Sequence, residues 1–122
     1  MRISKDEAKR VLRDVPPDKA FYFYRRVDNP ILFHASSLGD FVSMLKVLED
    51  ESLDFHCARG DFENWFRMLG DEELGRRVAE VWGRGLRGPD LKAVLLKVVR
   101  ARVLQLARSS KSNGAVRRRS GA

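Results

Sequence analysis

The chain has a single cysteine, Cys57, and therefore cannot form an internal disulfide. It also has no apolar run near the roughly 18 residues that a membrane-spanning helix needs. Residues 1–7 are charged and polar, where a secretory signal requires an apolar stretch. A lone thiol is typical of a reducing compartment. These absences predict a cytoplasmic protein without a membrane partner, and 43% apolar residues in a chain of 122 allow one core.

Acidic side chains are missing from the last part of the chain. From Leu91 onward there are nine basic residues and no acidic one, against 15 basic and 17 acidic residues before it. The net charge of +7 therefore divides into a nearly neutral body and a strongly cationic end. This segregation is typical of proteins that dock onto a polyanion. Solubility alone is the other explanation for such a charge run.

Local signals in the first third of the chain predict a helix and then a hairpin. Ser4 and Glu7 have the spacing of a capping box, and the prolines at 16–17 stop the helix that follows it. The aromatic run 20–27 and the apolar run 31–35 are separated by turn residues, so they predict two paired strands. Two strands are only marginally stable alone and must pack on helices.

Four further helices are predicted over residues 37–82. Ser37 is the expected N-cap of the first. Gly60 and Gly70 are expected to end the second and third helices, since glycine favours helix C-termini. Asp61 and Asp71 follow these glycines and are expected to cap the next helices. The Gly-Asp pairs thus predict tight corners between short helices.

The longest helix is predicted from Asp90 to about Arg108, and residues 109–122 are predicted to be a basic tail that is disordered when free. Helical spacing places Arg102 inside an apolar stripe of that helix. The other members of the stripe are Leu91, Val94, Leu95, Val98 and Leu106. The expected fold is α+β: a mainly helical domain over 1–108 with a small N-terminal β-hairpin and a long C-terminal helix, followed by the tail.

Residues 52–74 read Ser-Leu-x-Phe-His-x-x-Arg-Gly-Asp-Phe-x-x-Trp-x-x-x-Leu-Gly-Asp-x-x-Leu. This pattern resembles the central signature of a small uncharacterised domain family of archaea and bacteria, and residues 21–24 and 35–38 resemble its start. The resemblance would extend from about Pro17 to the long helix. Gly75 stands where that pattern would have alanine. The resemblance implies the domain boundaries and no catalytic residue.

Residues with catalytic or metal-binding chemistry are few. His56 and Cys57 are adjacent, so on a helix they point about 100° apart, and His34 is the only other imidazole. A zinc site needs more ligands than these. Cys57 has no recognisable base beside it in the sequence. The Gly-x-Gly-x-x-Gly string at 83–88 follows a helix instead of a strand, which does not fit a dinucleotide site. We expect no enzyme activity, metal, cofactor or small-molecule substrate.

Basic residues supply the candidate contacts to a nucleic acid. Arginine suits phosphate, and a basic tail can order on folded RNA. Structured RNA, that of the ribosome before others, is therefore the first expected partner, and chromatin-type DNA binding could use the same contacts. Tyr22 and Tyr24 could stack on unpaired bases if they face outward, although burial preferences favour packing on a helix. The candidate residues are Arg84, Arg87, Lys92, Lys97, Arg100, Arg108, Lys111, Arg117, Arg118 and Arg119.

A protein-interaction module is the alternative function. Leu96, Val103 and Leu104 lie on the side of the long helix away from its apolar stripe. A helix that is apolar on two sides is either deeply buried or in contact with a second partner. The alternative is therefore a homodimer or an adaptor joined through these three residues.

Overall fold

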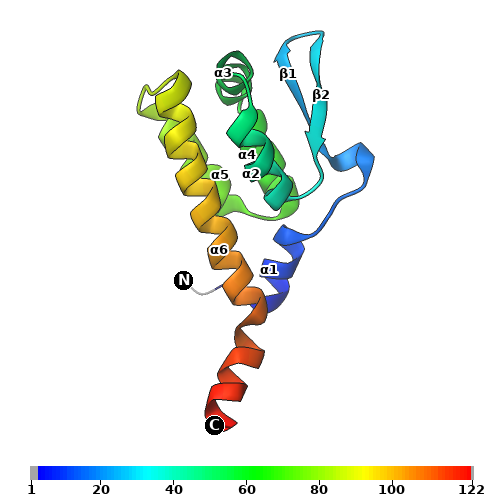
Figure 1. The fold of residues 1–122 in the computed structure, drawn as a ribbon, viewed down its shortest axis with the longest axis vertical. Helices are drawn as coiled ribbons and strands as arrows, with labels where there is room; N and C mark the ends of the chain where they lie inside the picture. The colour runs from blue at the N-terminus through cyan, green and yellow to red at the C-terminus, as the bar shows by residue number, and fades with distance from the viewer. Residues whose placement is uncertain (1–2, 122) are drawn as a thin grey trace.

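A two-stranded hairpin packs against a group of helices in the computed structural model, which describes residues 3–121 and the side chains of residues 3–111 (Figure 1). This arrangement confirms the predicted α+β, mainly helical class with an N-terminal hairpin and a long C-terminal helix. The elements are α1 Lys5–Leu12, the 3-10 helix η1 Pro17–Lys19, β1 Phe21–Arg26, β2 Asn29–Ala35, α2 Leu38–Val47, α3 Asp50–Arg59, α4 Asp61–Leu69, α5 Glu72–Gly83 and α6 Gly88–Gly121.

The hairpin pairs β1 with β2 in antiparallel register, with Phe21 opposite Ala35 and Tyr22 opposite His34. Alternation along β1 buries Phe21 and directs Tyr22 to solvent. The preference for tyrosines packed on a helix is therefore wrong, since Tyr22 is 46% and Tyr24 36% exposed. The phenylalanines of β1 fill the space against the helices, which leaves the tyrosines on the opposite face.

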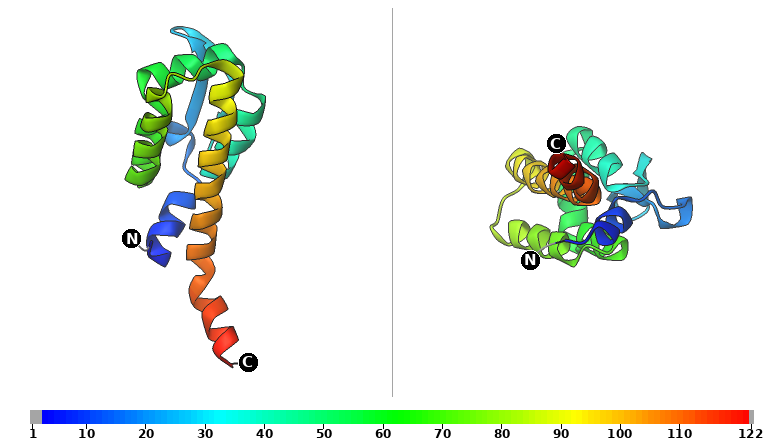
Figure 2. Two further views of the ribbon diagram at one scale, coloured as in Figure 1. Left: turned by 90° about the vertical axis from the view of Figure 1, so that its left-hand side faces the viewer. Right: turned by 90° about the horizontal axis from the view of Figure 1, so that it is seen from below.

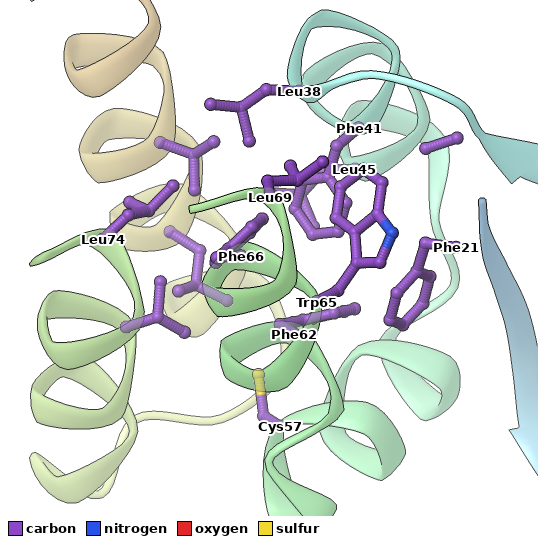
Figure 3. Packing of buried hydrophobic residues seen from close by; sticks show 14 of the residues in the cluster. Phe21, Leu38, Phe41, Leu45, Cys57, Phe62, Trp65, Phe66, Leu69 and Leu74 are labelled. Atoms are coloured by element: carbon purple, nitrogen blue, oxygen red, sulfur yellow. The ribbon is translucent and has the colours of Figure 1, made fainter. Parts of the chain in front are cut away.

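Aromatic rings fill the centre of the core, where α2 and α4 meet the hairpin (Figure 3). The ring of Phe41 lies 5.0 Å from that of Phe62 and 5.0 Å from that of Phe66, both nearly edge-on. Trp65 stacks on Phe41 at 5.8 Å. Edge-to-face pairs of this kind add to the free energy gained from apolar burial. Phe21 of β1 joins them with its ring 5.2 Å from that of Phe62, so the core holds β1 and α2 against α4.

Glycine corners connect the short helices as predicted. Gly60 and Gly70 have φ angles of 74° and 110°, in the left-handed region that favours glycine, and they end α3 and α4. Asp71 caps α5 by accepting a hydrogen bond from the Leu74 N–H at 3.0 Å. The predicted cap at Asp61 is wrong, because Gly60 is the N-cap of α4 and no side chain caps it.

Gly75 is buried where α5 crosses α4. A Cβ atom there would lie 3.3 Å from the Glu63 backbone oxygen and 3.2 Å from Arg67 Nε. Alanine would therefore be tight at this position, and glycine allows the two helices to approach closely.

Helix α6 passes the body and projects beyond α1 (Figures 1 and 2). It continues past the predicted end near Arg108 to Gly121, since no proline stops it and a single interior glycine costs only about 1 kcal/mol. Leu91, Leu95 and Leu106 are buried, and Val99 joins them although the sequence stripe had omitted it. Within the described residues, no helix has the length and apolar character to cross a membrane.

Arg102 lies inside the buried stripe of α6, as its spacing predicted. Its Nε and one terminal nitrogen each donate to a different carboxylate oxygen of Asp71, both at 2.8 Å. The other terminal nitrogen donates to Gln105. A buried arginine is tolerated here because both its charge and its donors are satisfied.

Candidate functional site

Four basic side chains form a stripe on the outer face of α6: Lys97, Arg100, Arg108 and Lys111. All four are exposed. Their spacing places them within about 80° of one another around the helix axis, over about 21 Å of helix length. We call this set the α6 basic stripe.

Within the described part of the chain, no carboxylate pairs with any residue of the α6 basic stripe. Arginines of the body differ in this respect: Arg76 binds Glu73 at 2.7 Å and Arg102 binds Asp71. The reason lies in the sequence, since no acidic residue follows Asp90. The stripe is thus a set of exposed cations on a helix that has no carboxylate after Asp90 to compensate them.

The other predicted basic candidates lie elsewhere. Lys92 is half-buried and its ammonium donates to the Leu48 carbonyl at the end of α2. Arg87 lies over the Trp82 ring at 3.6 Å and donates to the Leu86 carbonyl. Arg84 is exposed in the loop before α6, at the end of the helix away from Lys111. The side chains of Arg117, Arg118 and Arg119 lie outside the described residues.

The three apolar interface candidates are not equivalent. Leu96 and Val103 are partly buried and pack against the core. Leu104 is 54% exposed and lies within the α6 basic stripe. The apolar surface that α6 offers to a partner, over its described side chains, is therefore small.

The hairpin is fastened to the helices by polar side chains that the sequence analysis did not assign. His56 Nε2 accepts a hydrogen bond from the Tyr24 backbone N–H at 2.8 Å, and Ser52 Oγ donates to the Tyr24 carbonyl at 2.6 Å. Trp65 Nε1 donates to the Lys19 carbonyl at 2.8 Å. Ser52 and His56 are four residues apart on α3, so their spacing already indicated that they share one helix face.

His56 is neutral in this arrangement. The Tyr24 N–H can only donate, so Nε2 carries no proton, and Nδ1 then donates to Asp61 Oδ2 at 2.8 Å. Burial lowers the pKa of His56, an effect that hydrogen bonding and charge from Asp61 partly offset. Both ring nitrogens are therefore committed to holding the hairpin on α3 and α4.

The neighbouring Cys57 is also a structural residue. It is buried, and burial raises the pKa of its thiol to about 12. A thiol of this kind stays protonated at neutral pH and is a poor nucleophile. Among the described residues, no group of three or more histidine, cysteine, aspartate or glutamate side chains could hold a metal ion.

A pocket of about 540 Å³ opens beside this polar cluster, between β1, α3 and α4. Phenylalanine, tyrosine and tryptophan supply five of its twelve lining residues, and its polar groups include Arg59, Asp61 and Asn64. We call it the hairpin pocket. It is lined by Ala20, Phe21, Tyr22, Tyr24, Val27, Asp28, Phe55, His56, Arg59, Asp61, Asn64 and Trp65.

Comparison with known proteins gives no relative: no family model, no curated protein and no solved structure matches the chain. The resemblance of residues 52–74 to an uncharacterised domain family stays a prediction.

Proposed function

We propose that this protein binds structured RNA, with that of the ribosome as the first candidate, and that α6 makes the contact. The observation that carries the proposal is the α6 basic stripe, whose four cations are exposed and without carboxylate partners among the described residues. Exposed cations of this kind bind a polyanion favourably, because binding releases the counterions that are condensed on the phosphates of the polyanion.

The spacing of the stripe fits a phosphate backbone better than a single small anion. Its members extend over about 21 Å of helix, so several phosphates could be contacted at once. No side chain that reads base edges is needed for such binding, which predicts affinity with little sequence preference. RNA is favoured over DNA because exposed aromatic side chains on the hairpin, Tyr22 and Tyr24, suit unpaired bases.

The salt dependence of binding tests this proposal. Each phosphate contact contributes about 0.7 to 0.9 to the slope of log affinity against log salt. In titrations of a folded RNA at several salt concentrations, the double variant Lys97→Gln/Lys111→Gln should bind more weakly, with a slope shallower by about 1.5. The matched control is Lys19→Gln/Lys46→Gln, which removes the same charge from exposed positions outside α6.

An equal loss for both double variants would mean that only net charge matters, and no loss for either would refute the proposal. Duplex DNA titrated in parallel decides between the nucleic acids. Tighter binding of DNA at equal salt would replace RNA by a chromatin-type partner.

A further inference from the structure

We propose that the hairpin pocket is a binding site for a nucleobase that carries an exocyclic amino group, such as adenine or cytosine. The site is separate from the α6 basic stripe, because α2, α3 and α4 lie between the hairpin and α6 (Figures 1 and 2). The base could belong to a free nucleoside or to an unpaired residue of an RNA. Its recognition does not depend on α6.

The size and walls of the hairpin pocket suit a flat ring. Its volume of about 540 Å³ is within the range of small-molecule sites. Tyr22 and Tyr24 line it and are 46% and 36% exposed, although one face of the Tyr22 ring stacks on His34, and Phe55 is half-buried. Stacking of bases on exposed aromatic side chains is a general mode of single-strand recognition.

Two polar groups of the pocket have hydrogen-bonding capacity to spare. Asp61 uses Oδ2 for both His56 Nδ1 and Arg59 Nε, at 2.8 and 3.0 Å, and its Oδ1 accepts no bond from a described residue. The amide of Asn64 is exposed and likewise has no partner among the described residues. The pocket therefore offers a fixed carboxylate acceptor together with an amide that can both donate and accept.

This combination selects among the bases. An asparagine amide can accept from an amino group and donate to the adjacent ring nitrogen, as it does with adenine, and a carboxylate accepts from the amino group of cytosine. Uracil has no amino group and presents carbonyl oxygens beside an N–H instead. Its single N3–H can donate to Asp61 while Asn64 donates to one carbonyl, whereas an amino group has two N–H donors and can bind both residues, so adenine and cytosine are preferred over uracil.

The net negative charge of the pocket disfavours a phosphate group inside it. Its charged lining residues are Asp28, Arg59 and Asp61, which leave one net negative charge with His56 neutral. A quaternary ammonium ligand fits less well than a base, because it has no N–H group to donate to Asp61 or Asn64.

Titration calorimetry on the full chain tests the site directly. The probes are adenosine, cytidine, uridine, hexa-adenylate and hexa-uridylate, at a salt concentration high enough to screen phosphate contacts. We expect the amino-bearing probes to bind and uridine and hexa-uridylate to bind weakly or not at all. Asn64→Ala and Tyr24→Ala should each weaken adenosine binding, by about five- to a hundredfold for the amide.

Leu32→Ala is the matched control, because Leu32 is 98% exposed on the same hairpin and is not part of the pocket lining. It should bind adenosine like the unaltered chain. Binding of free adenosine would assign the pocket to a nucleoside, and binding of hexa-adenylate alone would assign it to an unpaired base; both support the proposal. Absence of both, equal binding of uridine, competition by tetramethylammonium, or unchanged binding by the two pocket variants would overturn it.

The proposals for the hairpin pocket and for the α6 basic stripe can be tested independently of each other. Lys97→Gln/Lys111→Gln should leave adenosine affinity unchanged, and Asn64→Ala should leave the salt slope for folded RNA unchanged. A loss of both properties in either variant would contradict the assignment of two sites.

Discussion

Breaking the buried ion pair between Arg102 and Asp71, which joins α6 to the start of α5, should strongly destabilise the protein. The side chains of these residues are only 8% and 1% exposed. Removing one partner of such a pair leaves an uncompensated charge, which costs about 3–5 kcal/mol. Arg102→Met keeps most of the side-chain volume, so the expected loss of about 3–5 kcal/mol in the free energy of unfolding reports the stranded Asp71 carboxylate.

A double variant separates charge from packing. Asp71→Asn keeps an oxygen that can accept from the Leu74 N–H and so preserves the cap of α5, worth about 1 kcal/mol. With Arg102→Met it replaces the pair by two uncharged groups. Since uncharged replacement of a buried pair is often nearly neutral, the double variant should be more stable than Arg102→Met alone.

Urea unfolding followed by circular dichroism measures both effects, with the midpoint and the slope fitted separately. Arg76→Met, which breaks an exposed pair with Glu73, is the matched control and should cost at most about 1 kcal/mol. A loss for Arg102→Met no larger than that of the control would refute the reasoning. So would a double variant that is less stable than Arg102→Met.

Three further predictions follow from the fold. Trp65→Ala should cost about 3–5 kcal/mol in thermal or urea unfolding, because it removes a buried ring and the Lys19 bond; a near-neutral change would contradict its place in the core. Burial lowers the pKa of His56 in the folded chain. As the pH falls below about 6.5, the His56 imidazole therefore binds a proton in the unfolded chain before it does so in the folded chain. Stability should therefore fall from pH 7 to 5, and His56→Gln should flatten this dependence. Because α6 exposes little apolar surface over its described side chains, Leu104→Asp should leave the sedimentation coefficient unchanged at high protein concentration; a shift from dimer to monomer would support the homodimer alternative.

Features set by local chemistry were predictable from the sequence. The Ser4 capping box, the Ser37 cap and the glycine ends of α3 and α4 all form as expected. Each depends on residues within a few positions of one another, so tertiary contacts had little scope to override it. Asp61 is the exception, since its carboxylate binds His56 and Arg59 in place of capping α4.

The hairpin pocket was not predictable, because its lining joins residues 20–28 to residues 55–65. Their proximity depends on how β1 lies across α3, and the bonds that decide this involve the Tyr24 backbone. Backbone groups are the same at every position, so the sequence does not indicate which strand residue His56 and Ser52 will bind. The outward face of Tyr24 follows from the same two bonds.

The burial of Arg102 and the exposure of the α6 basic stripe have a common cause. Helical geometry places Arg102 about 140° around the axis from Lys97, so the inward turn that brings Arg102 to Asp71 carries the stripe outward. A helix with several leucines and valines on more than one side could rotate without large loss of apolar burial. The paired charge removes that freedom, because any other rotation would strand it in the core. The buried arginine thereby determines which face of α6 carries the four exposed cations.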